Sequence, residues 1–108
     1  MKKTAVLYRE QGLGSNISIE LQRKSCREYA EQKVWTVEQE YIAHENVSGT
    51  IDDPLLMIKQ SIKNGEIDTV LVYSYFCISG SQMEIPMVIK WLINNNVKFH
   101  SVCEGSFV

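Results

Sequence analysis

The sequence has little of what marks non-globular, exported or membrane-bound chains. It has two prolines and six glycines in 108 residues, and 44% of its residues are hydrophobic, which excludes a disordered or collagen-like chain. No apolar run approaches the ~20 residues of a membrane-spanning helix. The first apolar run, Ala5 to Tyr8, is too short for a signal peptide. These absences predict a single domain over residues 1–108, in the cytoplasm and not in a membrane.

Cysteine and histidine are also scarce. The three cysteines are odd in number and widely spaced: Cys26, Cys77 and Cys103. No CxxC pair exists, so the sequence predicts reduced thiols rather than a zinc site or a disulfide framework. His44 and His100 have no cysteine or acid at ligand spacing. We therefore expect no metal and no cofactor.

A basic excess is missing as well. Eleven Lys and Arg stand against thirteen Asp and Glu, which gives a formal net charge of -2. A domain that binds nucleic acid by itself usually carries a cluster of positive charge. Strong DNA binding by this chain alone is therefore not expected.

The hydrophobic pattern alternates between strands and helices. Strands are predicted over residues 4–8, 34–43, 69–73 and 97–103, and helices over 18–33 and 82–93. A further helix begins at Asp52-Asp53-Pro54, an acidic cap followed by proline, and ends at Asn64-Gly65. The order β-α-β-α-β-α-β predicts an α/β fold of three layers. Its sheet is mainly parallel and four-stranded, with helices on both faces.

The third predicted helix is apolar on almost every side, and Met83, Met87 and Trp91 are among its apolar residues. An ordinary surface helix has one apolar face. The pattern leaves three interpretations open. The helix is buried on several sides, or its outer face contacts a second subunit in a homo-oligomer, or Met83, Met87 and Trp91 are simply core or semi-exposed residues of a single chain.

Ligands of open parallel sheets bind beyond the carboxyl ends of the strands. Arg9 ends the first strand, and a loop with Gly12 and Gly14 follows it. A guanidinium there can hold a phosphate through two parallel hydrogen bonds, and a helix N-terminus also favours an anion. The Arg9–Gly14 loop is thus a candidate anion or nucleotide site. The alternative is an ion pair between Arg9 and a nearby acid: Glu10, Glu45 or Asp52.

Several short motifs, in order and at matching spacings, resemble the catalytic domain of the serine recombinases, the resolvase and invertase group. Ala5 to Arg9 is similar to that family's opening strand, which ends in Tyr-x-Arg-x-Ser. Ser18 to Arg23 matches its Ser-Leu-Glu-x-Gln-Arg motif. Further matches lie along the rest of the chain: Glu40 to Ile42, Asn46 to Thr50, Asp52 to Pro54, and Asn64 to Tyr73.

The resemblance implies a chemistry in which a serine attacks a DNA phosphodiester and arginines balance the charge on the phosphate. This sequence departs from the family at those positions. Gln11, or Gly12 in the other alignment, stands in the place of the nucleophile. Asp53 replaces an arginine, and the family's Leu-Asp-Arg-Leu-Ser-Arg motif has become Tyr75 to Gly80, with Phe76, Cys77 and Gly80 at its charged positions. The residues left for a phosphate site are Arg9, Gln22 and Ser48.

The resemblance therefore predicts a recombinase-type domain with a degenerate catalytic site. We expect it not to cleave DNA, to bind DNA weakly, and to act through association with other copies or with an intact recombinase. The chain also ends before the family's long helix and DNA-binding domain. Other hypotheses remain: a small domain that binds an anion or nucleotide at the Arg9–Gly14 loop, a recombinase that uses Ser15, and a gene remnant that still folds.

Overall fold

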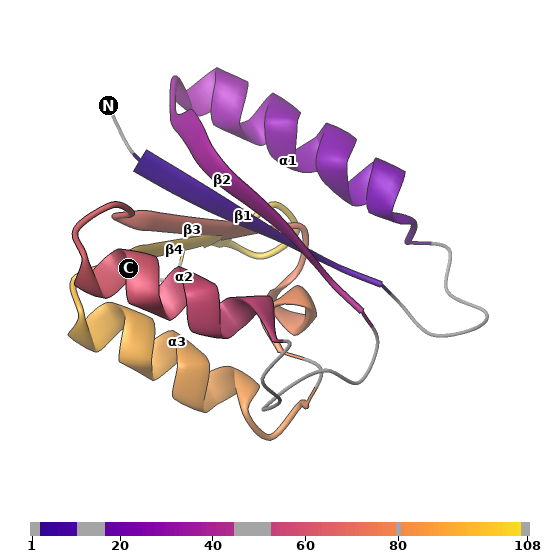
Figure 1. Cartoon of the computed structure of the whole chain (residues 1–108). Helices are drawn as coiled ribbons and strands as arrows, with labels where there is room; N and C mark the ends of the chain where they lie inside the picture. Colours follow the sequence, from indigo (N-terminus) through magenta and orange to yellow (C-terminus); the bar gives the residue numbers. More distant parts are fainter. Residues whose placement is uncertain (1–2, 11–16, 45–52, 80, 107–108) are drawn as a thin grey trace.

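The computed structural model describes residues 3–10, 17–44, 53–79 and 81–106 (Figure 1). Strands and helices alternate along the chain, as the sequence predicts. In order, the elements are β1 (Lys3–Arg9), α1 (Ile19–Lys33), β2 (Thr36–Ala43), α2 (Pro54–Lys63), β3 (Thr69–Val72), the 3₁₀ helix η1 (Tyr75–Cys77), α3 (Ile85–Asn94), β4 (Lys98–Ser101) and β5 (Gly105–Ser106).

The strands form one sheet in the order β2-β1-β3-β4-β5. The first four strands are parallel, which confirms the predicted fold class. The sequence did not predict β5, a two-residue strand antiparallel to β4. The sequence also predicts that the fourth strand runs to Cys103, whereas β4 ends at Ser101. Val102 and Cys103 donate their backbone N–H groups to the ends of β3, at Val72 and Tyr73, and turn the chain back toward β5.

Capping residues set the helix ends where the sequence indicates them. The Ser18 hydroxyl accepts a hydrogen bond from the Leu21 N–H at the start of α1. Asp53 does the same for Leu55 at the start of α2, with Pro54 as the first helical residue. Asn64 is the C-cap of α2, and Gly65 follows in the left-handed region at φ 75°.

The starts of β2 and α3 differ from the prediction. In both cases, residues whose pattern predicts a strand or a helix form a cap or a turn instead. The sequence places Val34 in the second strand, but it is the left-handed C-cap of α1 at φ 59°, and β2 begins at Thr36. The sequence also places residues 82–84 in the third helix. They form a turn, and α3 begins at Ile85 with Pro86 in its first turn.

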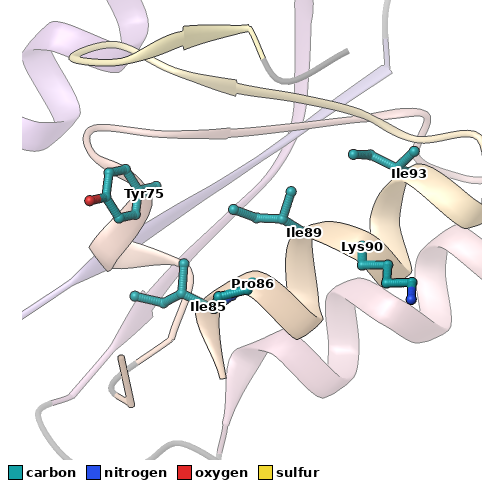
Figure 2. A pocket seen from close by; sticks show the side chains of 6 residues that line it. All are labelled: Tyr75, Ile85, Pro86, Ile89, Lys90 and Ile93. Atoms are coloured by element: carbon teal, nitrogen blue, oxygen red, sulfur yellow. The ribbon is translucent and has the colours of Figure 1, made fainter. Parts of the chain in front are cut away.

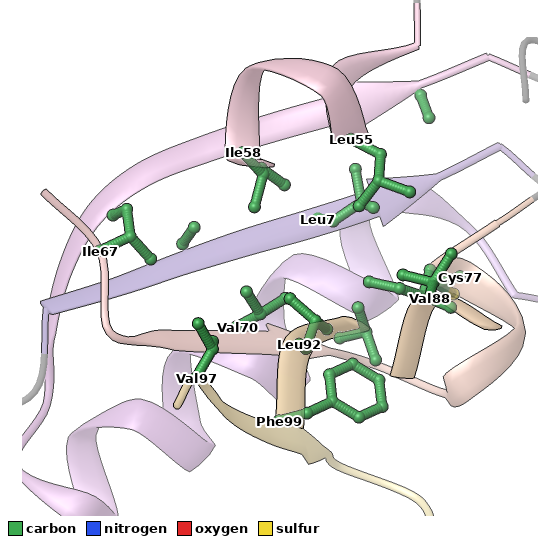
Figure 3. Packing of buried hydrophobic residues seen from close by; sticks show 14 of the residues in the cluster. Leu7, Leu55, Ile58, Ile67, Val70, Cys77, Val88, Leu92, Val97 and Phe99 are labelled. Atoms are coloured by element: carbon green, nitrogen blue, oxygen red, sulfur yellow. The ribbon is translucent and has the colours of Figure 1, made fainter. Parts of the chain in front are cut away.

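Helices cover both faces of the sheet, α1 on one and α2 with α3 on the other (Figure 1). Under α1 lies a small core that includes Val6, Cys26 and Leu71. Under α2 and α3 lies the main core, in which Leu7, Ile58 and Phe99 are fully buried (Figure 3). Alternate residues of β1 and β3 point into the two cores, as expected for strands covered on both faces.

The third helix is amphipathic after all. Ile85, Val88 and Leu92 are buried, whereas Met87 is 70% exposed and Met83, just before the helix, is 86% exposed. Burial on several sides, one of the three predicted interpretations, is therefore wrong for this chain, and contact with a second subunit stays a prediction. Among the described residues no helix combines the length and apolarity needed to cross a membrane.

Candidate functional site

A buried polar cluster lies at the carboxyl end of β1, the edge of the sheet where the sequence predicts a site. Its members are Arg9, Gln22, Asp53 and Cys77, and we call it the Arg9 cluster. Gln22, which is fully buried on α1, joins the helix to the strand. Its side-chain oxygen accepts from the Arg9 N–H at 2.9 Å, and its side-chain nitrogen donates to the Arg9 carbonyl at 2.8 Å. This amide satisfies the backbone of β1 where the sheet ends.

The guanidinium of Arg9 points into the protein, toward the elements that follow β2 and β3. Its Nε donates to the Cys77 carbonyl of η1 at 3.1 Å. Its Nη2 lies 3.9 Å from the Asp53 carboxylate at the start of α2, and both side chains are only 4% exposed. The sequence predicted an ion pair with Glu10, Glu45 or Asp52 as the alternative to a phosphate site. The structure pairs Arg9 with Asp53 and Glu10 with His44, whereas Glu45 and Asp52 lie outside the described residues.

The charge on Asp53 serves two contacts at once. Its Oδ1 accepts from the Leu55 N–H at 3.0 Å and also faces Arg9. A carboxylate at a helix N-terminus is favoured by the helix dipole. Burial lowers the pKa of the Arg9 guanidinium, and the carboxylates of Asp53 and Glu84 act against that shift. The charge of Arg9 therefore faces acids of the same chain, and burial still lowers its pKa overall.

Cys77 closes the cluster from the side of η1. Its thiol donates to the Gln22 side-chain oxygen at 3.7 Å. Burial raises the pKa of this thiol, although the backbone of Ser74 and the charge of Arg9 act in the opposite direction. The neighbouring Phe76 lies outside the cluster and is 41% exposed. The thiol is held neutral, because a thiolate in this position would lose its hydration.

The structure thus brings together four of the residues singled out in the sequence: Arg9, Gln22, Asp53 and Cys77. The other candidates, Gln11, Gly12, Ser48 and Gly80, lie outside the described residues, as does Ser15. Whether Arg9, Gln22 and Ser48 bind phosphate stays a prediction.

Two glutamates near the cluster were missed by sequence reasoning. Glu84, before α3, accepts from the Ser79 hydroxyl at 3.0 Å and acts on Arg9 through its charge. Glu104, after β4, accepts from the Ser74 hydroxyl at 3.0 Å and from the Tyr75 N–H at 2.9 Å, which fixes the start of η1. Neither glutamate stands at a recognisable spacing from its partners, so the sequence carries no signal for these contacts.

The described residues contain no group of three or more His, Cys, Asp or Glu side chains that could hold a metal ion. His44 faces Glu10 with 2.8 Å between Nδ1 and Oε2. His100 lies across the sheet from that pair and has the Tyr29 hydroxyl 3.1 Å from its Nδ1. The two histidines therefore belong to separate contacts.

Comparisons with known proteins agree on one family. The model of the resolvase N-terminal domain matches residues 9–107. The structure of the N-terminal catalytic domain of TP901-1 integrase is 27% identical, with a TM-score of 0.80, and the match covers 96% of this chain and 79% of that one. The C-terminal catalytic domain of ISC1926 TnpA, an IS607-like serine recombinase, shares the fold at 15% identity, with a TM-score of 0.75, over 93% and 67% of the two chains. No curated protein matches the sequence.

Proposed function

The chain belongs to the resolvase N-terminal domain family of serine recombinases, and from this premise we propose that it keeps the family's fold without cleaving DNA. The observation that carries the proposal is the buried ion pair between Arg9 and Asp53. To bind a phosphate, an arginine side chain has to be accessible at the protein surface. Arg9 is 3% exposed and already faces a carboxylate of the same chain.

The sequence around the pair supports the same conclusion. By resemblance, Gln11 or Gly12 occupies the place of the nucleophilic serine, and neither side chain can attack a phosphodiester. Cys77 stands where the family has an arginine, and it is buried beside Arg9 with a neutral thiol. Loss of one group that stabilises transition-state charge costs about 10²–10³ in rate. Here the nucleophile and several cations are replaced together.

The remaining role that we propose is association with other recombinase-type catalytic domains. Support comes from the exposed apolar side chains of α2 and α3, on the face opposite α1: Leu56, Met57, Met87 and Ile93. Large exposed apolar patches on small domains usually mark protein contacts. With a net charge of -2, the chain also lacks the electrostatic term that dominates nonspecific DNA affinity.

A covalent trapping assay tests the absence of cleavage. The purified chain is mixed with a supercoiled plasmid that carries the DNA flanking its gene. The reaction is quenched in denaturant and examined for nicked circles and protein–DNA adducts. An active serine recombinase on a plasmid with its own site is the positive control. We expect no adduct. An adduct that disappears in the Ser15→Ala variant would show that the chain is an active recombinase and would overturn the proposal.

Association is tested separately, by adding the chain to the active recombinase encoded nearest to it. We expect the two proteins to co-elute and strand exchange to fall as the chain is added. Unchanged exchange, together with separate elution of the two proteins, would remove the proposed role while leaving the inactivity result untouched.

A further inference from the structure

The carboxylate of Glu104 lies in the turn between β4 and β5 and joins that turn to the start of η1. Its two oxygens accept from the Ser74 hydroxyl at 3.0 Å and from the Tyr75 N–H at 2.9 Å. The Ser101 hydroxyl contacts the same carboxylate, and the Glu104 N–H donates to the Ser101 oxygen at 3.3 Å. Ser101 is fully buried in β4, so the carboxylate is anchored to the sheet on one side and to η1 on the other.

The 3₁₀ helix η1 has little internal structure that could fix where it begins. It spans three residues, and a 3₁₀ turn of this length is weakly stable by itself. Ser74 is its N-cap, but the side chain of Ser74 makes no capping bond within η1, and its hydroxyl donates to Glu104 instead. The Glu104 carboxylate, which accepts from the Tyr75 N–H, therefore takes the place of a cap.

The outer side of η1 also gives limited support to its start. Tyr75 and Phe76 are 37% and 41% exposed. Tyr75 borders a shallow apolar hollow of about 410 Å³ along α3, and Figure 2 shows its ring at one end of that hollow. At the far end of η1, by contrast, Cys77 and Ile78 are buried. The start of η1 therefore depends on its polar contacts more than its end does.

The end of η1 belongs to the Arg9 cluster. The Cys77 carbonyl accepts from the Arg9 Nε, and the Cys77 thiol donates to Gln22. The Cys77 N–H donates to the Ser74 carbonyl at 2.8 Å, so one turn links the residue that Glu104 holds to the residue that faces Arg9. Burial raises the pKa of the Cys77 thiol, and the charge of Glu104 adds to that shift. A surface contact is thus connected to the buried guanidinium through a single turn.

We propose that Glu104 is a latch that keeps the Arg9 cluster closed. While its carboxylate holds the start of η1, Arg9 stays turned into the protein, and release of the carboxylate opens Arg9 to a small oxyanion such as inorganic phosphate. Glu104 is exposed whereas Arg9 is 3% exposed, so a contact with the β4–β5 turn acts on the site without entering it. The inference rests on the closed Arg9 site of the proposed function and adds the device that controls it.

NMR of the full chain tests the latch in the Glu104→Ala variant. The Arg9 Nε–H should exchange with water about tenfold faster, the change expected from loss of one hydrogen bond to a charged group. Low concentrations of urea should not alter that rate, because opening of η1 alone exposes little surface. Added inorganic phosphate should give a saturable shift of the Arg9 Nε–H resonance in Glu104→Ala, and none in the unsubstituted chain over the same concentrations.

Two control variants separate the latch from a change in charge and from a loss of stability. Glu66→Ala removes an exposed carboxylate before β3, so it makes the same change in net charge. Leu92→Ala destabilises the main core, in which Leu92 is fully buried. Neither variant should give a phosphate response at Arg9.

Two further variants identify the contact itself. Glu104→Gln keeps one acceptor oxygen and should give a weaker phosphate response than Glu104→Ala. The double variant Ser74→Ala, Glu104→Ala should bind phosphate no more tightly than Glu104→Ala alone, because both changes remove the same contact. Additive effects of the two changes would show that Ser74 and Glu104 act separately and would overturn the latch.

The remaining outcomes distinguish the latch from the proposed function. Absence of a phosphate response in Glu104→Ala, or an equal response in Glu66→Ala, would overturn the latch and leave the closed site intact. A phosphate response of the unsubstituted chain would show that Arg9 is already open, and it would overturn the closed site together with the latch. The DNA trapping assay is independent of both, because it detects cleavage and not access to Arg9.

Discussion

The Arg9 cluster and the outer face of α3 distribute polar and apolar side chains in opposite ways. In the Arg9 cluster a guanidinium, a carboxylate and an amide are buried at the carboxyl edge of the sheet. On α3 and just before it, Met83 and Met87 are left exposed. Exposed polar groups at the strand ends and buried apolar groups on the helices are the usual arrangement for an α/β domain with a polar ligand.

The Arg9 cluster and the outer face of α3 are two different kinds of feature in one fold. At the strand ends, the Asp53 carboxylate lies 3.9 Å from the Arg9 guanidinium within the protein. On α3 and just before it, Met83, Met87 and Ile93 are exposed, whereas Ile85, Val88 and Leu92 are buried. We propose that the first feature closes the site and that the second is a contact surface.

The largest expected effect comes from breaking the ion pair from one side. Arg9→Met removes the cation and leaves the Asp53 carboxylate buried beside an apolar side chain. We expect a loss of about 3 kcal/mol in the free energy of unfolding, because a buried charge without its partner is costly. Urea unfolding followed by circular dichroism measures it. The double variant Arg9→Met, Asp53→Asn keeps an N-cap on α2 and should recover most of the loss. If it recovers none, the pair is not the source of the effect.

A loss of comparable size is expected for Gln22→Ala. The change removes both side-chain hydrogen bonds to Arg9 and leaves a buried backbone N–H and C=O without that amide. Each such group costs about 1–3 kcal/mol, so we expect roughly 2–4 kcal/mol in urea unfolding. Gln32→Ala on the exposed end of α1 is the matched control and should change stability by less than about 0.5 kcal/mol. Similar losses in the two variants would contradict the account of the cluster.

Thiol labelling tests the burial of the cysteines in the unsubstituted chain, so it needs no variant of altered stability. Cys103 is exposed, whereas Cys26 and Cys77 are buried. Burial raises the pKa of Cys26 to about 12 and also raises that of Cys77. Because the thiolate is the reactive form, iodoacetamide at pH 8 should modify Cys103 and spare the other two. Mass spectrometry of the native and urea-unfolded chain gives the pattern. Rapid native labelling of Cys77 would show that the Arg9 cluster is open.

The same raised pKa values set the direction of an alkaline effect. The folded state holds these thiols protonated at pH values where the unfolded chain releases the protons. Stability should therefore fall as the pH rises above the ordinary thiol pKa of about 8.5. Replacing Cys26 with alanine should reduce that slope in urea unfolding measured between pH 8 and 10. An unchanged slope would show that a group other than Cys26 causes the dependence of stability on pH.

The smallest effect is expected on the outer face of α3. Met87→Ser should change the free energy of unfolding by less than about 0.5 kcal/mol, because this side chain is already 70% exposed. Leu92→Ala, on the buried face of the same helix, should cost about 2–5 kcal/mol. Thermal unfolding of both variants sharpens the contrast between the two sides of the helix. A large loss for Met87→Ser would mean that the methionine is covered by the protein itself.

Much of the fold follows from local patterns. Ser18, Asp53 with Pro54, and Asn64 with Gly65 mark helix ends because their effects act within one turn. The apolar run of β3 indicates a strand covered on both faces. Val34 and β5 escaped prediction for the same physical reason, because their conformations depend on contacts with other elements. A left-handed valine and a two-residue strand have no stable local preference.

The site was only partly predictable. The resemblance pointed to Arg9, Gln22, Asp53 and Cys77 one by one, because each stands in a short motif. Their mutual contacts join β1, α1, α2 and η1, which are far apart in sequence. The sequence therefore left open whether Arg9 binds a phosphate or pairs with a nearby acid, and it did not identify Asp53. The missed glutamates Glu84 and Glu104 show the same limit.

The central claim, that the recombinase-type site is closed by an internal ion pair, is tested most directly by NMR of the Arg9 side chain. Its Nε–H donates to the Cys77 carbonyl, so it should give a resonance protected from exchange with water. The account predicts that this resonance stays unchanged as inorganic phosphate or a short DNA duplex is added. A saturable shift of the Arg9 Nε–H resonance, absent in Arg9→Met, would show an open phosphate site and contradict the account.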